Sequence, residues 1–240
     1  MLSSTPVIFG IDPYVESAYQ EHQLGAVGFT ADGRKFHYAK AGASLTAGNL
    51  IQAPAQDTGE QNLAPAANAA IGATSVSVTC GGTVAANLFT EGYLVITVTP
   101  GNGLYYRIKK HDALASATAT TFELYDPLKI AITAAASKID LVMNPYKNVI
   151  QNPSSATAAP VGVTLIAATS TYYFWVQSGG VAPVLAQGTI TVGNLVVASN
   201  GTAGAVENAA NSSTEAQAVV GVATTGVATG ENGGVNLMLP

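Results

Sequence analysis

The longest stretch of this chain without a charged side chain runs from Asn148 to Val206. Valine, alanine and threonine are frequent in it, and Pro153, Pro160 and Pro183 interrupt it together with several glycines. Because these residues leave no apolar block of helical length, the stretch is not expected to cross a membrane as a helix. A stretch this long and uncharged would expose large apolar patches on a free monomer, so it is expected to be buried against other protein chains.

The centre of this stretch predicts a β-strand followed by a tight turn. The only tryptophan of the chain, Trp175, directly follows three other aromatic residues. Aromatic and β-branched side chains favour a pleated, half-buried surface, so Thr171–Gln177 is predicted to form a strand. Gly179 and Gly180 are predicted to form the turn, since glycine adopts positive φ angles without steric cost. Trp175 is interpreted as a core anchor rather than a ligand-stacking residue, because no polar cluster lies beside it.

Short turn signals recur along the chain. The word Thr-x-Gly-Asn-Leu-[Ile/Val] is found at Thr46–Ile51 and again at Thr191–Val196. The two copies lie too far apart for the period of roughly 20–50 residues that a solenoid shows. We therefore expect the same strand–turn–strand arrangement at both places, with a separate element inserted between them. Asp32 and Gly33 separate two extended runs and predict a β-hairpin.

Composition divides the rest of the chain into modules. Residues 52–71 are dominated by Ala, Pro, Asn, Gln and Asp and are predicted to be a linker. Residues 72–146 carry alternating apolar and polar runs and are predicted to form an inserted β module, followed by a second linker at 147–160. Residues 1–51 and 161–240 are expected to pack together as the other β module. The expected fold class is all-β, with β-sandwich or β-barrel-like modules and little helix.

The N-terminal region contains a signal for a short helix, and a second short helix is expected within Ala205–Gln217. Asp12 offers an N-cap and Pro13 suits the first helical position, so a short helix is predicted over Tyr14–Gln20. Tyr14 and Tyr19 in this segment are expected to dock against a neighbouring chain or against their own chain.

The charge content of the chain is low, which favours burial in an assembly. Charged residues make up 10% of the sequence and the net charge is −5, whereas ordinary globular domains carry roughly 25% charged residues. No Lys or Arg follows Lys147, which argues against a phosphate-binding groove in the last third of the chain. The densest basic cluster, Arg107–His111, is interpreted as a solvated strand end. The alternative to an assembly is an Ala- and Thr-rich domain that stays monomeric.

The sequence contains few patterns with catalytic or metal-binding chemistry. His22, His37 and His111 lack the spacing of metal ligands with one another or with Cys80, the only cysteine. Zinc-protease, serine-hydrolase and phosphate-loop motifs are missing from the sequence. A single cysteine allows no intrachain disulfide. We therefore expect no enzyme, with no catalytic, cofactor-binding or metal residues.

Three loosely patterned parts of the sequence carry a family resemblance. The first, Val161–Gly180, is a Gly-hydrophobic run followed by an aromatic-Trp-Val-Gln segment and glycine. The second is the C-terminal end, from Val220–Thr224 to Gly234–Leu239. The third consists of short runs in the inserted module, namely Gly92–Val95, Tyr106–His111, Tyr125–Leu128 and Leu141–Tyr146. Together these parts resemble the capsid decoration, or cement, proteins of tailed-bacteriophage heads.

The resemblance implies a β-rich homotrimer on the outer surface of a virion. Its partners would be the major capsid protein and its own copies, without direct contact to nucleic acid or membrane and without a cofactor. The module of residues 1–51 and 161–240 would then pack on the shell or around the trimer axis. The alternative from another class is a phage head or tail fibre, or a receptor-binding adhesin, that binds a host glycan through exposed aromatic residues. The interface residues that we predict are Tyr14, Tyr19, Tyr105 and Tyr106.

Overall fold

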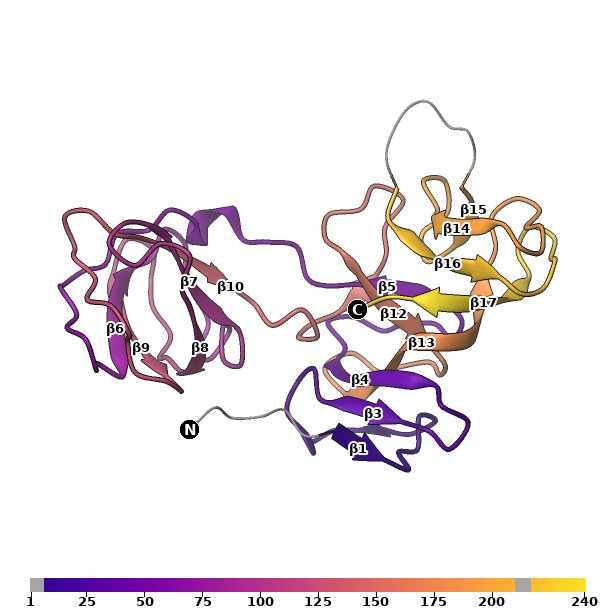
Figure 1. Cartoon of the computed structure of the whole chain (residues 1–240), viewed down its shortest axis with the longest axis horizontal. Helices are drawn as coiled ribbons and strands as arrows, with labels where there is room; N and C mark the ends of the chain where they lie inside the picture. Colours follow the sequence, from indigo (N-terminus) through magenta and orange to yellow (C-terminus); the bar gives the residue numbers. More distant parts are fainter. Residues whose placement is uncertain (1–6, 210–216) are drawn as a thin grey trace. The chain divides into compact units, whose positions relative to one another are not determined.

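The computed structural model describes residues 7–209 and 217–240 and shows an almost entirely β-stranded protein (Figure 1). Strands make up 43% of the chain and helix 1%, which confirms the predicted all-β fold class. The helical part of the described residues is one turn of 3-10 helix, η1 (Thr58–Glu60). The chain divides into two compact units. The inserted unit is Gln56–Asn144, and the terminal unit joins the segment that ends at Ala55 to Pro145–Pro240.

The inserted unit is built on a five-stranded antiparallel sheet with the order β10-β7-β8-β9-β6. Buried and more exposed residues alternate along the strands, as expected for a sheet with one face on a core. The inward side chains, among them Leu94, Ile108 and Phe122, form one apolar core. The strands are β6 (Ser75–Thr79), β7 (Tyr93–Val98), β8 (Tyr105–Lys110), β9 (Ala119–Leu124) and β10 (Lys138–Val142).

A segment outside these strands closes the sheet. Leu63 exchanges two backbone hydrogen bonds with Ile139 of β10, at 2.8 and 2.9 Å. Pro65 forms an antiparallel bridge with Val78 of β6. Because β10 and β6 are the two edges of the sheet, residues 63–66 link these edges and leave neither of them unpaired along its whole length. The inserted unit is therefore a small barrel-like module.

The unit boundaries differ from the linkers expected at 52–71 and 147–160. The first segment contains the bridges that close the inserted unit, so it belongs to the sheet of that unit. The second contains β11 (Ile150–Gln151), which pairs antiparallel with β5 (Leu50–Gln52) in the terminal unit. Both expected linkers are thus paired to a sheet, through single bridges or a two-residue strand. Composition does not reveal pairing this short, so the sequence suggested linkers.

The terminal unit contains a 12-stranded sheet with the main path β1-β3-β4-β13-β17-β16-β14-β15. The hairpin predicted around Asp32 and Gly33 is confirmed as β3–β4. Of the residues expected in this module, 1–6 and 210–216 lie outside the described residues. Besides β5 and β11, the strands are β1 (Val7–Phe9), β2 (Glu16–Ser17), β3 (Val27–Phe29), β4 (Lys35–Lys40), β12 (Pro160–Thr164), β13 (Tyr173–Leu185), β14 (Leu195–Ala198), β15 (Val206–Asn208), β16 (Val219–Ala223) and β17 (Asn232–Met238).

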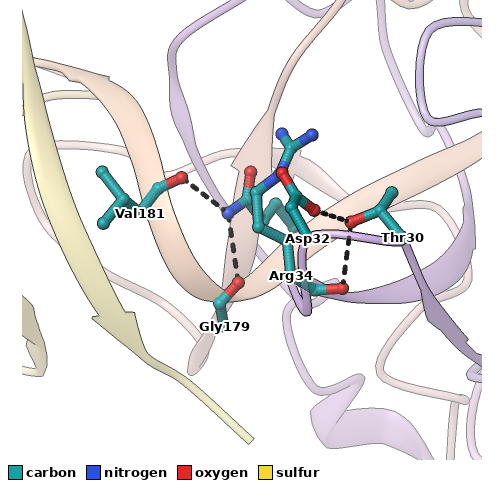
Figure 2. A network of polar contacts seen from close by, with 6 residues as sticks. Thr30, Asp32, Arg34, Gly179 and Val181 are labelled. Carbon is teal, nitrogen blue, oxygen red and sulfur yellow. Dashed lines mark hydrogen bonds and ion pairs between the residues drawn. The ribbon is translucent and has the colours of Figure 1, made fainter.

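Strand β13 continues through the position where a turn was predicted. Its first half pairs antiparallel with β4, and its second half, from Gly179 onward, pairs with β17. A β-bulge lies at the change of partner, where the buried Gln177 amide donates to the carbonyl oxygens of Gly179 (3.1 Å) and Val181 (3.0 Å) (Figure 2). The predicted Gly179–Gly180 turn is therefore wrong, because the positive φ of Gly180 (79°) serves a bulge within one continuous strand.

Trp175 is a core residue, as its sequence context predicted. It is 5% exposed, and its ring lies 5.1 Å from that of Tyr38 in an edge-to-face arrangement. Phe36 and Ala26 belong to the same apolar cluster. The aromatic run before Trp175 therefore builds the core on the β4 side of β13.

The helix predicted over Tyr14–Gln20 is wrong. The segment contains β2, whose residues Glu16 and Ser17 pair with β13. The Glu16 carboxylate also accepts hydrogen bonds from the backbone N–H and the hydroxyl of Thr169, both at 2.7 Å. Asp12 accepts the N–H of Tyr14 at 2.9 Å, which forms a local turn and not a helix cap. Tertiary pairing with β13 therefore replaces the helix that local capping signals favoured.

The repeated Thr-x-Gly-Asn-Leu word forms the same turn at both places. Gly48 and Gly193 take positive φ angles of 77° and 83° there, and the turns lead into β5 and β14. Each turn pairs with a second turn that lacks the word and leads into β13 or β17. The bridges that join them are Leu45 with Ala168 and Ile190 with Val227. Turns of this strand–turn–strand arrangement therefore also occur where the sequence word is missing.

We predict that Gln177→Leu destabilises the terminal unit. The substitution removes two buried hydrogen-bond donors at the bulge, which should lower the free energy of unfolding by about 1–3 kcal/mol. Urea unfolding followed by the fluorescence of Trp175 would measure this. Gln20→Leu is the matched control, since the Gln20 side chain is exposed and its acceptor, the His22 carbonyl, can bind water instead. Equal stability of both variants would contradict the role assigned to Gln177.

Candidate interaction surface

One face of the terminal sheet combines exposed apolar side chains with the absence of charge. Cross-strand pairing places Val181, Asn236, Val222 and Leu195 in one row across β13, β17, β16 and β14. Partners in register point to the same side of a sheet, and so do residues two positions apart in a strand. Val219 and Met238 extend the row on the same side, because Val219 pairs with Val197 and Met238 follows Asn236 by two residues. We call this surface the uncharged face.

The apolar residues of the uncharged face are open to solvent. Val181, Leu195, Val219 and Met238 are between 48% and 64% exposed. The opposite side of the same strands carries the buried core residues, including Val184, Val196 and Leu237. These strands therefore place apolar side chains on both faces, whereas a sheet with one solvated face normally alternates apolar with polar residues.

Polar groups border the uncharged face at both ends. At the β13 end, Asp32, Gly33, Arg34 and Gly180 line an open groove together with Val181 and Asn236. Arg34 Nε contacts Asp32 Oδ2 at 2.8 Å, which fixes this border. The Thr30 hydroxyl donates to the other oxygen of Asp32 (Figure 2). At the β14 end, Val197 pairs with Glu207 of β15. An apolar centre with a polar border is the usual organisation of a protein–protein interface.

The four predicted interface tyrosines have different surroundings. In the terminal unit Tyr14 is 60% and Tyr19 is 81% exposed. In the inserted unit Tyr105 is 67% exposed and its ring meets that of Tyr93 edge to face at 5.6 Å. Tyr106 is only 4% exposed, and its hydroxyl accepts the backbone N–H of Lys129 at 2.9 Å. The structure therefore rules out Tyr106 as an exposed contact residue, because strand alternation turns it into the core.

The sequence alone did not show which residues make up the uncharged face. Its residues come from four strands whose order in the sheet is not the order in the sequence. The alternation in Asn232–Met238 was a usable signal, because a strand with one buried face leaves Asn236 and Met238 on the other side. The charge-free stretch pointed to the right region, but it could not separate the core side from the open side.

His37 is a buried titratable group of the terminal unit. It is 6% exposed, its ring stacks on Tyr146 at 4.6 Å, and its Nδ1 lies 3.0 Å from the Ser178 hydroxyl. Burial, with a smaller contribution from the charge of Lys35, lowers the pKa of His37 to about 4. The ring is therefore neutral at neutral pH and acts as a packed, hydrogen-bonded core residue.

Cys80 is similarly inert. It is 1% exposed in the core of the inserted unit. Burial, followed by a hydrogen bond and the charge of Glu60, raises the pKa of its thiol to about 12. Since the thiolate is the reactive form, Cys80 does not have the surroundings of a nucleophile. One oxygen of the buried Glu60 accepts the Gly82 N–H at 2.8 Å, which holds the turn after β6.

Within residues 7–209 and 217–240, no group of three or more His, Cys, Asp or Glu side chains could hold a metal ion. The described part of the chain also has no helix with the length and apolar character needed to span a membrane.

Comparison of the chain with protein-family models, with curated proteins and with solved structures finds no match.

We predict that His37 makes the terminal unit sensitive to mild acid. The pKa of His37 is about 4 in the folded chain and about 6.5 in an unfolded one. Unfolding therefore takes up a proton as the pH falls below about 6.5, and the free energy of unfolding should drop by about 2–3 kcal/mol between pH 7 and pH 4. Urea unfolding at a series of pH values, followed by Trp175 fluorescence, would measure the drop.

The control for this prediction is His37→Gln. This variant keeps a neutral side chain of similar size that can still bond Ser178, and it should lose most of the pH dependence between pH 6.5 and 4.5. Carboxylates titrate in the lower part of that range in both proteins, so the difference between them isolates the histidine. Parallel stability curves for the two proteins would disprove the assignment.

Proposed function

We propose that this protein is a non-enzymatic virion structural protein that binds the outside of a bacteriophage head and stabilises contacts between major capsid subunits. The observation that carries the proposal is the uncharged face of the terminal unit. Four of its apolar residues are about half exposed or more, and a surface of this kind is normally covered by another protein chain. The resemblance of the sequence to capsid decoration proteins supplies the particular partner.

The energetics of the uncharged face suit a permanent assembly. Burying apolar surface contributes roughly 25 cal/mol per Å², and no ion pair has to be desolvated in the centre of the face. A subunit that spans two capsid proteins adds buried area that must be exposed again before they separate. Polar groups at the border, Asp32 and Arg34 at one end and Glu207 at the other, would fix the orientation of the partner.

Self-association into a homotrimer is part of the same proposal. The charge-poor sequence from Asn148 to Val206 contributes β13 and β14 to the uncharged face. The exposed Tyr14 and Tyr19 remain our candidates for contact with a neighbouring subunit, and Tyr14 hydrogen-bonds the Arg34 side chain at the border of the uncharged face.

A fibre or adhesin is the competing proposal, and copy number in the virion separates the two. A shell-binding protein should be present in numbers comparable to the major capsid protein and should be distributed over the head. Quantitative mass spectrometry of purified virions together with electron microscopy would measure both properties. A few copies at one vertex or on the tail would contradict shell binding and favour the adhesin.

We predict that introducing charge on the uncharged face abolishes association. Leu195→Glu and Met238→Glu each place a carboxylate among apolar residues at an exposed position, so folding should be retained while the oligomer, and binding to capsids that lack the protein, are lost. Light scattering and a capsid co-sedimentation assay would show this. Ile71→Glu is the matched control, because Ile71 is an exposed apolar residue of the inserted unit, 69% open to solvent.

The salt dependence of association is a second test of the same interface. Association through apolar surface should change little between low and high salt, because few ion pairs are available for screening. A wild-type protein that stays monomeric at micromolar concentration would refute the trimer. Release from virions by salt alone would show that charged groups hold the protein on the shell.

A further inference from the structure

The outer face of the inserted sheet carries an ordered row of aromatic and cationic side chains. Register pairs Val142 of β10 with Tyr93 of β7, and Tyr93 with Arg107 of β8. The N–H of Tyr125, the residue after β9, donates to the Arg107 carbonyl at 3.0 Å. Their neighbours in sequence, such as Leu94 and Ile108, point into the core, so the row lies on the solvent side.

The rings in this row are held in fixed orientations. Tyr93 meets the exposed Tyr105 edge to face, with ring centres 5.6 Å apart and planes at 79°. The Arg107 guanidinium lies 5.3 Å from the centre of the Tyr125 ring. Contacts of these two kinds restrict the side chains without covering all of the ring surface. The face therefore presents ordered aromatic surface at two places on the sheet.

A polar groove continues from the end of the row. Tyr125 lines it together with Thr74, Ser75, Thr121, Lys109 and Glu123, and its volume is about 560 Å³. Lys109 Nζ and Glu123 Oε2 lie 3.9 Å apart and are both about half exposed. The groove thus offers hydroxyl groups, one cation and one carboxylate to a ligand that already contacts Tyr125.

We propose that this face of the inserted unit binds an oligosaccharide, with Tyr93, Tyr105 and Tyr125 as stacking residues and Lys109, Glu123 and the neighbouring hydroxyls as hydrogen-bonding residues. A sugar ring has an apolar C–H face that packs on an aromatic ring and a rim of hydroxyls that donate and accept hydrogen bonds. Apolar surface with a few convergent polar groups is the usual composition of a small-ligand site. A carboxylate and an ammonium group side by side match hydroxyls, which need both an acceptor and a donor.

The charges of this face favour a hydroxyl-rich ligand over a nucleic acid. Single-stranded nucleic acids also stack on aromatic residues, but they require a positively charged groove for their phosphates. Here the cations Arg107, Lys109 and Lys138 are nearly balanced by the carboxylates of Glu123 and Asp140. Asp140 pairs with Val95 opposite Tyr105. The carboxylates would repel a phosphate backbone, whereas they accept hydrogen bonds from sugar hydroxyls.

This inference goes beyond the proposed function and does not depend on it. Shell binding is assigned to the terminal unit, and the sugar site uses residues of the inserted unit alone. A shell protein with such a site would give the virion many weak contacts to a glycan-coated surface, and repeated weak sites raise overall affinity by avidity.

The test uses the full-length chain on an array of bacterial surface polysaccharides and derived oligosaccharides. Wild-type protein should bind at least one glycan, and the best oligosaccharide should then be titrated by saturation-transfer NMR. Tyr105→Ala and Tyr125→Ala should each weaken binding roughly fivefold or more, the loss expected for one stacked ring. Glu123→Gln should also weaken it, because the carboxylate accepts two hydrogen bonds that an amide accepts less well.

Tyr19→Ala is the matched control, since it removes an exposed tyrosine from the terminal unit and should leave sugar binding unchanged. Thermal unfolding of each variant confirms that folding is retained. Absence of binding to every glycan on the array would overturn the proposal, as would glycan binding that is unaffected by the three substitutions in the inserted unit. Tighter binding of a twelve-residue thymidine oligonucleotide than of any glycan would assign the face to single-stranded nucleic acid instead.

Discussion

Backbone pairing along β13 holds the terminal unit together, because this one strand pairs with β2, β4, β12 and β17. β4 and β17 lie on opposite edges of β13, and a bulge between Gln177 and Gly179 interrupts the pairing with β4. The Gln177 amide fixes that bulge through the carbonyls of Gly179 and Val181. Because β13 lies between β4 and β17, it joins the N-terminal strands and the C-terminal strands in one sheet. The core around Trp175 and the uncharged face beginning at Val181 are therefore two consequences of the same strand.

The inserted unit solves the problem of free sheet edges in a different way. Residues 63–66 bridge β10 on one side and β6 on the other, so both edge strands gain a partner from a segment of irregular structure. Closure leaves the outer face of the sheet as its main solvent-facing surface. This face is polar and aromatic, with Tyr105 and the Lys109–Glu123 pair on it, whereas the exposed face of β13, β17, β16 and β14 is apolar and uncharged. The two units thus expose surfaces of different chemistry, to which we assign a protein partner and a hydroxyl-rich ligand as proposals.

Two buried titratable residues are held in their neutral forms by burial. His37 and Cys80 have pKa values shifted by burial towards their neutral forms, to about 4 and about 12 respectively. A neutral imidazole and a neutral thiol can be packed at little electrostatic cost, which is why they are compatible with the core. Their position inside the sheets agrees with a protein that acts through its surfaces.

The sequence by itself determined the β-strands, the hairpin at Asp32 and Gly33, and the core position of Trp175, because alternation, turn chemistry and aromatic content act over a few residues. It also located the charge-poor region that supplies part of the uncharged face. Only the tertiary structure decided the continuation of β13 through Gly179, the strand at Glu16 in place of a helix, and the burial of Tyr106 beside the exposed Tyr105. The first two outcomes depend on a partner strand distant in sequence, and pairing with that strand outweighs the local preference of a glycine pair or a helix cap. The burial of Tyr106 depends on which side of β8 faces the core. The uncharged face and the aromatic row have the same origin, since strand order and register bring their residues together.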